Sequence, residues 1–388
     1  MRENKRKILL AIFLVIAIIS AFIAGYYVQK VNELTSTGAA TADAEWDRYL
    51  GRNVQQIFED SSGNIWFAGE NPGWGVAKFD GENWEIYDSR DIAGISSVTG
   101  IGEDNCGNVW VGTYVDGLSK FDGIAWTNYN ASNSELLICN RIDLLFSDSS
   151  GNIWIETLKE GNGIVTYNGI QCEYVIYKIS DGNWTMYDKD TTGAGKSRCE
   201  HIDQIFEDWE GNLWFMGGID GVIEFDGENW TAYNESEIGL KQVYSMFQDR
   251  NLNLWFGGCN RVVKLDRNGN ITKYNVDGTV YDIIQDRDGN TYFVTLAGIK
   301  VIPRGCNCSF TLLECGMYPE PHSMFCDDKG RIWFLTDEDG VFVYVREYTS
   351  GELGLYHYDI REPMTFFQDS FGDMWIGTLD GVLKFKGI

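Results

Sequence analysis

The residues that could carry out chemistry in this chain are scattered along it rather than grouped in one motif. Only three histidines occur, His201, His322 and His357, and a histidine beside a carboxylate is a common general base. Trp74 lies outside the repeated pattern described below, and its ring could stack on a sugar or a cation, or pack on its own loop. Whether any of these residues act together depends on the elements that position them.

A repeated pattern supplies those elements. It consists of a short apolar run, then Asp-x-x-Gly-Asn-(Ile/Leu/Val)-Trp, then a second run that ends in Phe-Asp-Gly. Successive aromatic positions of the motif lie 44, 44, 60, 41, 37, 41 and 42 residues apart, which is the length of four short strands with their turns. We number the eight copies repeats 1 to 8 in chain order, with turn aspartates at Asp60, Asp104, Asp148, Asp208, Asp249, Asp286, Asp327 and Asp369.

This spacing predicts an all-β chain that folds as an eight-bladed β-propeller, with strands a to d in each blade. Helical periodicity is absent from the repeats. The pattern weakens between Val280 and Tyr358, so a seven-bladed ring with one degenerate blade is the alternative. The Asp-x-x-Gly and Asp-Gly segments are turn formers, because aspartate accepts hydrogen bonds from turn amides and glycine tolerates positive φ.

The two ends of the repeat region complement each other. Strand d carries the mark Trp-x-x-Tyr in repeats 1 to 4, and one further copy, Trp46 to Tyr49, precedes the first strand a. The last repeat stops after strand c, near Phe385. We therefore expect residues 44–50 to form the outer strand of the last blade, because closing the ring in this way leaves only short blade edges exposed.

The N-terminal segment has the features of a membrane anchor. Four basic residues and one acidic residue in 1–7 precede residues 8–28, which carry no charge and are long enough to span a bilayer. The basic flank keeps the N-terminus in the cytoplasm. We therefore predict a cytoplasmic tail at 1–7, a transmembrane signal anchor at 8–28, a flexible linker at 29–43 and a propeller at 44–388 outside the cell membrane. A cleaved signal peptide, and hence secretion, is the alternative.

The chain is strongly acidic. Its net charge of −26 includes +3 from the first 28 residues, so the remaining part carries −29. This charge argues against nucleic acid as a partner. The nine cysteines include Cys306, Cys308, Cys315 and Cys326, whose spacing fits no common zinc motif and which could form disulfides outside the cell. We expect no metal ion and no cofactor.

The segment from Glu103 to Thr113, with Gly117 to Gly123, resembles the two-component regulator propeller repeat. The usual form of that repeat is close to Glu-Asp-x-x-Gly-Asn-Ile-Trp-Ile-Gly-Thr followed by Gly-Gly-Leu-x-x-Phe-Asp-Gly, and Asp369 to Phe385 is similar to it as well. The resemblance implies an extracytoplasmic sensor that binds saccharides or other small ligands and is often fused to a histidine kinase. No kinase segment follows Ile388, so we expect a separate membrane signalling protein as partner. Streptogramin-lyase-like propellers are similar in repeat style.

A ligand is expected where the repeats differ from one another. The a–b and c–d turns, which carry the stereotyped Asp-x-x-Gly and Asp-Gly segments, share one face of a propeller, here called the turn face. The b–c and d–a loops share the opposite face, here called the variable face. The candidate ligand-binding residues on the variable face are Arg52, Trp74, Asp116, Arg141, Asp143, His201, Asp203, Lys241, Tyr244, Arg261, Asp282 and His322.

These residues predict that a sensor-like domain binds a small polar ligand, with carbohydrates among the candidates. A protein docking scaffold is one alternative. The other is an enzyme, either streptogramin-lyase-like or glycan-degrading, in which His201 or His322 next to a carboxylate would provide the base. We assign no catalytic residue, because these two histidines belong to repeats 4 and 7 and are expected to lie far apart.

Overall fold

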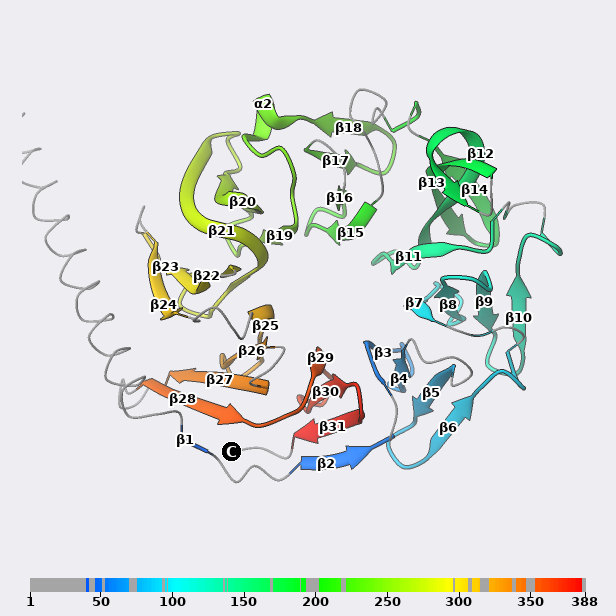
Figure 1. Cartoon of the computed structure of the whole chain (residues 1–388), viewed down its shortest axis with the longest axis horizontal. Coiled ribbons are helices and arrows are strands. Elements are labelled where there is room, and N and C mark those ends of the chain that lie inside the picture. Colours follow the sequence, from blue (N-terminus) through cyan, green and yellow to red (C-terminus); the bar gives the residue numbers. More distant parts are fainter. Residues whose placement is uncertain are drawn as a thin grey trace, which may run out of the picture.

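The strands of the chain form sheets that are arranged in a ring (Figure 1). The structure is a computed structural model, and it describes residues 40–41, 46–50, 53–69, 75–92, 95, 97–134, 137, 139–167, 170–188, 190–192, 202–217, 221–295, 297–305, 309–314, 321–336, 340–346 and 353–385. Apart from one short helix, α2 (Glu235–Ile238), the elements of this described part are strands. The prediction of an all-β propeller is therefore confirmed.

Each repeat begins with an inner strand a, and its later strands follow toward the outside of the ring (Figure 1). Repeat 1 contains β3 (Gln56–Glu59), β4 (Ile65–Ala68), β5 (Val76–Phe79) and β6 (Trp84–Tyr87). Repeat 2 contains β7 (Val98–Glu103), β8 (Val109–Thr113), β9 (Leu118–Phe121) and β10 (Trp126–Tyr129). Repeat 3 contains β11 (Ile142–Ser147), β12 (Ile153–Tyr167), β13 (Ile170–Ser180) and β14 (Asn183–Tyr187). Repeat 4 contains β15 (Ile202–Glu207), β16 (Leu213–Gly217), β17 (Val222–Phe225) and β18 (Trp230–Tyr233).

The second half of the chain continues this order. Repeats 5 and 6 contain β19 (Ser245–Gln248), β20 (Leu254–Leu265), β21 (Ile271–Gln285), β22 (Thr291–Thr295), β23 (Gly298–Ile302) and β24 (Phe310–Glu314). Repeat 7 contains β25 (Pro321–Cys326), β26 (Ile332–Thr336), β27 (Gly340–Arg346) and β28 (Leu353–Tyr358). Repeat 8 contains β29 (Pro363–Gln368), β30 (Met374–Thr378) and β31 (Gly381–Phe385). Two strands precede the repeats, β1 (Ala40–Thr41) and β2 (Trp46–Tyr49).

The turn aspartate of each repeat holds the a–b turn and the aromatic residue of strand b together. In repeat 1, Asp60 Oδ1 accepts hydrogen bonds from the backbone N–H groups of Ser62 and Asn64 at 3.0 and 2.9 Å. Asp60 Oδ2 accepts a bond from Trp66 Nε1 at 2.8 Å. The bond from the aromatic residue recurs in all eight repeats, with Tyr292 OH in place of the indole in repeat 6. The turn is therefore a structural element, as the sequence predicted.

Aromatic contacts and hydrogen bonds join one repeat to the next. Trp66 of repeat 1 stacks on Tyr87, with ring centroids 6.0 Å apart, and meets Trp126 of repeat 2 edge-on at 6.3 Å. On the turn face, Ser61 donates to the Glu103 carboxylate from its backbone N–H at 2.7 Å and from its hydroxyl at 2.8 Å. Bonds from a turn residue to the Glu or Gln that ends strand a also link repeats 3 and 4, 4 and 5, 5 and 6, 7 and 8, and 8 and 1.

The N-terminal strand closes the ring. β2 pairs antiparallel with β31, and Trp46 stands opposite Phe385 in this register. The Tyr49 ring lies 5.3 Å from the ring of Trp84 and 5.9 Å from the ring of Trp375, between centroids. β2 therefore serves as the outer strand of repeat 8, which confirms the predicted closure by the N-terminal segment.

The ring has seven hydrogen-bonded sheets, so the prediction of eight separate blades is not supported. One of the sheets contains the six strands β19 to β24, which come from both repeat 5 and repeat 6. These two repeats merge because β21 is one continuous strand of 15 residues. Its first part, from Ile271, pairs with β20, and its last part, from Val280 to Gln285, pairs with β22. The expected d–a loop is thus part of β21, in which Gly278 has a φ of 92°.

The predicted cytoplasmic tail (1–7) and transmembrane anchor (8–28) lie outside the described residues, as does most of the predicted linker. Within the linker, β1 pairs in parallel with β28 of repeat 7. No helix among the described residues is long and apolar enough to cross a membrane. The location of the propeller outside the cell membrane stays a prediction.

Candidate functional site

Several predicted site residues are not described. Arg52, Trp74 and His201 lie outside the described residues, and so does the side chain of His322, whose backbone belongs to β25. The hypotheses of a Trp74 stacking platform and of a histidine base therefore stay predictions. The described candidates are Asp116, Arg141, Asp143, Asp203, Lys241, Tyr244, Arg261 and Asp282. Four of them interact with one another or with the same neighbours, and the other four do not.

Arg141 and Asp143 form an ion pair at the start of β11, the inner strand of repeat 3. Arg141 Nε lies 2.6 Å from Asp143 Oδ1, and the two side chains are only 20% and 12% exposed. The guanidinium also lies over the ring of Tyr114 in repeat 2, at 4.5 Å from its centroid. Burial lowers the pKa of Arg141, but the ion pair outweighs burial and raises it. A cation is thus held between a carboxylate and an aromatic ring.

Glu156 in β12 places a carboxyl group in the interior beside this ion pair. Only 1% of the residue is exposed. Its Oε1 accepts a hydrogen bond from the backbone N–H of Ile202 in repeat 4 at 2.6 Å, whereas Oε2 is buried and has no hydrogen-bond partner among the described residues. Burial raises the pKa of Glu156 well above its usual range, and Asp143 and Asp203 raise it further against the opposing effects of Ile202 and Arg141. The neutral form of Glu156 is therefore favoured.

Asp203, at the start of the inner strand of repeat 4, extends the group toward repeat 5. It interacts electrostatically with Glu156 and with Tyr244. The Cys259 thiol donates a hydrogen bond to the Tyr244 hydroxyl at 3.8 Å. Burial raises the pKa of Tyr244, and Cys259, Tyr281 and Asp203 contribute in the same direction, so the hydroxyl keeps its proton.

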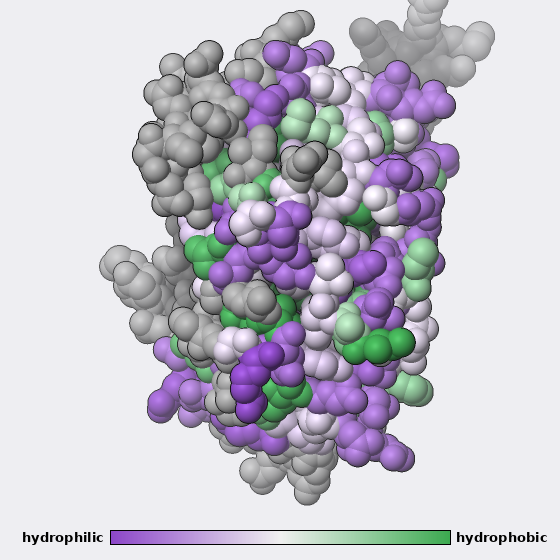
Figure 2. Space-filling view, turned by 90° about the vertical axis from the view of Figure 1, so that its right-hand side faces the viewer, coloured by the Kyte–Doolittle hydropathy of each residue, from purple (hydrophilic) through white to green (hydrophobic). Residues whose placement is uncertain are grey.

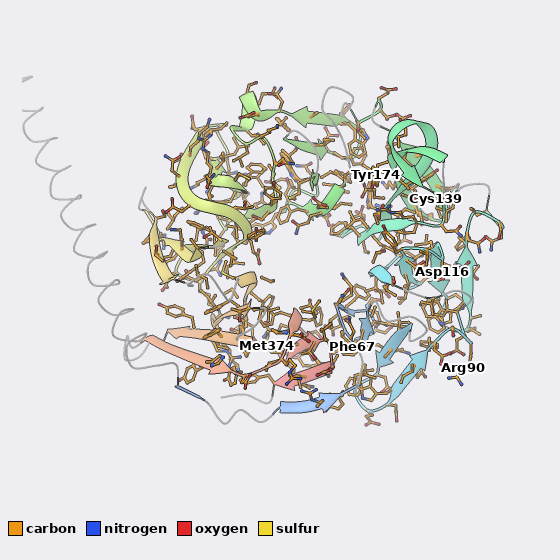
Figure 3. All side chains as sticks on the ribbon, in the orientation of Figure 1. Phe67, Arg90, Asp116, Cys139, Tyr174 and Met374 are labelled. Atoms are coloured by element: carbon orange, nitrogen blue, oxygen red, sulfur yellow. The ribbon has the colours of Figure 1, made fainter. Side chains whose placement is uncertain are left out.

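Tyr174 in β13 completes the group. Burial raises the pKa of Tyr174 to about 12, and Arg141, Asp143 and Glu156 are among its electrostatic neighbours. Tyr174 packs with Cys139, and Figure 3 shows both residues in repeat 3. We call the following set the polar cluster: Tyr114, Arg141, Asp143, Glu156, Tyr174, Asp203 and Tyr244. Three carboxyl groups, one guanidinium and three phenols from four successive repeats thus lie together.

The other described candidates do not join the polar cluster. Asp282 is half-buried, and its Oδ2 accepts a bond from the backbone N–H of Met324 in repeat 7 at 2.7 Å. Burial raises the pKa of Asp282 to about 6. Arg261 Nη1 donates to the C-cap carbonyl of α2 at 2.9 Å. These two residues therefore tie elements of the ring together. Of the last two candidates, Asp116 is half-buried and Lys241 is exposed.

A hollow of about 750 Å³ lies on the turn face, where the sequence predicted no ligand. The a–b turns of repeats 1 to 3 line it, together with Ser370 of repeat 8. The two glutamates in its wall are engaged in contacts between repeats, since Glu103 accepts bonds from Ser61 and Glu59 accepts bonds from Ser370. The three aspartates in the wall, Asp60, Asp104 and Asp148, accept bonds within their own turns. The lining is therefore the repeated structural surface that the sequence led us to expect on this face.

Sequence reasoning missed Tyr114, Tyr174 and Glu156. A signal for Glu156 was present, because it stands two residues after the strand b tryptophan, where all other repeats have glycine or an apolar residue. Those residues are Ala68, Gly112, Met216, Gly257, Val294, Leu335 and Gly377. A carboxyl group at a core position of only one repeat indicates a special role. The two tyrosines had no comparable signal, because tyrosines occur throughout the repeats.

Comparison with known protein families agrees with the repeat pattern. The family described as two component regulator propeller matches residues 49–71, which cover the first hairpin of repeat 1. The resemblance read from the repeats is therefore confirmed for this segment. No curated protein matches the chain.

Solved structures of similar shape share little sequence with this chain. The computationally designed Ika8 protein has a TM-score of 0.54 and 10% identity, over 90% of this chain and 98% of its own. Virginiamycin B lyase from Staphylococcus aureus has a TM-score of 0.49 and 18% identity, over 75% of this chain and 95% of its own. The extracellular domain of a putative hybrid two component system from B. thetaiotaomicron has a TM-score of 0.41 and 18% identity, over 86% of this chain and 56% of its own. The first likeness concerns the overall fold alone, and none of them indicates a ligand.

Proposed function

We propose that this chain, a propeller with repeats of the two-component regulator type, binds a small polar ligand through the polar cluster on its variable face. In this proposal the propeller is the sensing part of a membrane-anchored, extracytoplasmic protein that reports to a separate signalling protein. The polar cluster itself is the observation that carries the proposal. It brings an ion pair, a buried carboxyl group and phenols together near the starts of the inner strands.

The composition of the polar cluster differs from that of the contacts that hold the ring together. Those contacts use turn residues and the Glu or Gln that ends strand a, and they recur around the turn face. The polar cluster instead uses residues that are peculiar to single repeats, such as Glu156. A buried carboxyl oxygen without a partner costs about 1–3 kcal/mol, and such a cost is typical of functional sites.

A docking scaffold has less support. On the side of the ring shown in Figure 2, described apolar residues form small separate patches between polar ones. Two exposed aromatic residues of the turn face, Trp209 and Phe371, are 62% and 83% exposed, but they belong to repeats 4 and 8, which are not adjacent. Protein-binding surfaces are usually contiguous, so this distribution favours a small ligand.

Replacing Arg141 by alanine is expected to weaken ligand binding at least about 100-fold, because the guanidinium organises Asp143 and Tyr114 within the polar cluster. Thermal shift of the purified propeller against sugars, amino acids and amines, followed by calorimetric titration of the hits, measures this effect. Arg141→Lys is expected to restore only part of the affinity, since lysine keeps the charge but lacks the planar fork of donors.

Arg90→Ala is the matched control. Arg90 also pairs with an aspartate, Asp88, but its side chain is 85% exposed, and Figure 3 shows it at the outer rim of the ring. Its loss is expected to leave affinity and unfolding temperature unchanged. The proposal is wrong if no compound stabilises the wild-type protein, or if Arg141→Ala binds as tightly as Arg90→Ala.

A further inference from the structure

Repeats 5 and 6, which share one sheet, differ in charge from the rest of the chain. Residues 249–305 contain eight basic and six acidic side chains, a net charge of +2, whereas the whole chain carries −26. The strands of these repeats, β19 to β24, lie together in one part of the ring (Figure 1). An anion that approaches the propeller is therefore repelled less by repeats 5 and 6 than by the other repeats.

Four arginines of these repeats lie in turns of the turn face. Arg250 and Arg287 directly follow the turn aspartates of repeats 5 and 6, where no other repeat has a basic residue. Arg267 and Arg304 lie in the c–d turns, at the position where repeats 1, 2 and 4 have glycine. All four are exposed, and none of them forms an ion pair with a described carboxylate. The repeated turn pattern does not require these arginines.

A cavity of about 150 Å³ lies between repeats 5 and 6 on the turn face. Arg304 and Lys264 contribute two positive charges to its wall, and Asp249 contributes one negative charge. Asp249 is only 1% exposed, because its carboxylate accepts bonds from its own turn and from Trp255, and it lies 4.0 Å from Lys264 Nζ. A cavity of this size has room for about five water molecules, so a phosphate or sulfate group fits.

Two side-chain amides add neutral hydrogen-bond donors to this wall. Gln285 Nε2 donates to the Gly289 carbonyl at 3.4 Å and to the Thr291 hydroxyl at 3.5 Å, and both distances are long for hydrogen bonds. The side-chain amide of Asn251 makes no hydrogen bond to a described residue. Both amides can therefore turn toward a bound oxyanion without breaking a strong hydrogen bond.

Local packing holds the two cations at the cavity. The Arg304 N–H donates to Asn290 Oδ1 at 3.0 Å. The Arg304 side chain packs over Gly289, which has a φ of 86° and where a Cβ atom would lie 3.3 Å from Arg304 Cδ. Lys264 packs on strand b of repeat 5, with Nζ 5.1 Å from the centroid of the Trp255 ring. Glycine in the a–b turn thus leaves room for the arginine of the neighbouring c–d turn.

We propose that this cavity binds a phosphate or sulfate group, either as the free anion or as an ester of a small molecule. Arg304 presents a planar fork of donors that matches two oxygens of such a group, and Lys264 adds a point charge. Asn251 and Gln285 donate to the remaining oxygens. A carboxylate, with two oxygens and one charge, matches this wall less well. The site lies on the turn face, so the inference goes beyond the function proposed for the variable face.

Calorimetric titration of the full chain at low ionic strength tests the inference. The probes are inorganic phosphate, sulfate, acetate and glucose 6-phosphate. We expect phosphate or sulfate to bind at one site per chain, about tenfold or more tightly than acetate, and to bind more weakly as sodium chloride is added. Glucose 6-phosphate distinguishes the source of the group, because tighter binding than phosphate favours an ester and equal binding favours the free anion.

Arg304→Ala is expected to lower the affinity for phosphate or sulfate about tenfold or more, because hydrogen bonds between charged groups are lost. Arg267→Ala is the matched control. Arg267 is also exposed and lies in the c–d turn of the neighbouring repeat, but it does not line the cavity. Its loss is expected to change the affinity less than about twofold. Neither variant is expected to shift the unfolding midpoint, since both arginines are exposed.

Three results would overturn the inference. The first is that neither phosphate nor sulfate binds more tightly than acetate. The second is an equal loss of affinity in Arg304→Ala and Arg267→Ala, because the anion is then attracted by the surface as a whole and not by the cavity. The third is a loss of anion binding in Arg141→Ala but not in Arg304→Ala. That result would assign the anion to the polar cluster, so it would support the proposed function while contradicting the inference.

Discussion

A chain that begins at Asn53 is expected to lose most of its free energy of unfolding, because it lacks β2. Four residues of β2 pair with β31, at about 1 kcal/mol per backbone hydrogen bond. Tyr49 also packs against Phe79, Trp84 and Trp375, which contributes about 2–3 kcal/mol. The sum, about 6–7 kcal/mol, is comparable with the whole stability of a typical domain. Urea unfolding followed by tryptophan fluorescence measures the loss, and light scattering detects aggregation through the exposed edge of β31.

A chain that begins at Ala44 is the control for this truncation. It lacks β1, whose two residues pair with β28, but it keeps β2. Its unfolding midpoint is expected to stay close to that of the chain that begins at Ala40. If the chains that begin at Ala44 and at Asn53 unfold at the same urea concentration, then β2 does not hold the ring closed.

Asp249→Ala is expected to destabilise the propeller by about 3–5 kcal/mol. Asp249 is 1% exposed, and its carboxylate accepts bonds from the backbone N–H groups of Asn251 and Asn253 and from Trp255 Nε1. Alanine leaves the turn amides and the indole N–H without their acceptor, and each unsatisfied buried group costs about 1–3 kcal/mol. The shift of the urea midpoint at constant m-value measures the effect.

Asp266→Ala tests a turn of similar geometry that water can reach. Asp266 accepts bonds from the N–H groups of Asn268 and Asn270 in the exposed c–d turn of the same repeat. Water can replace the carboxylate there, so the unfolding midpoint is expected to change little. If Asp249→Ala and Asp266→Ala lower the free energy of unfolding equally, then the burial of the turn aspartate and its tryptophan does not contribute to stability.

The turns and the ring closure could be predicted from the sequence because each depends on a short local pattern that recurs. Asp60 with Trp66, and Trp46 with Tyr49, belong to such patterns. The merging of repeats 5 and 6 could not be predicted in this way. Asp277-Gly278 has the composition of a turn, and Gly278 has a φ of 92°, yet the segment belongs to β21. The Gly278 N–H donates to Asn260 Oδ1 from β20 at 2.9 Å. A side chain 18 residues away in the sequence thus takes the place of the local turn bond.

The candidate site was predicted in part. The repeat pattern shows which residues lie at the start of strand a, and this was sufficient to identify Arg141, Asp143, Asp203 and Tyr244 as candidates. The sequence could not show which of the twelve candidates belong together, because the joining contacts cross from one repeat to another. The bond from the Ile202 N–H to Glu156, for example, spans 46 residues. Such contacts depend on how the repeats are rotated against each other in the ring.

Ring closure is the claim on which the common variable face depends, and a double-cysteine cross-link tests it most directly. Asp47 and Lys384 are Cα partners in the pairing of β2 with β31, and the Cα distance of antiparallel partners suits a disulfide. The protein with Asp47→Cys and Lys384→Cys, oxidised while dilute and then digested, should yield a linked peptide from a monomer, which mass spectrometry identifies. If the two cysteines stay unlinked, or link only between molecules, then the ring is not closed by its N-terminal strand.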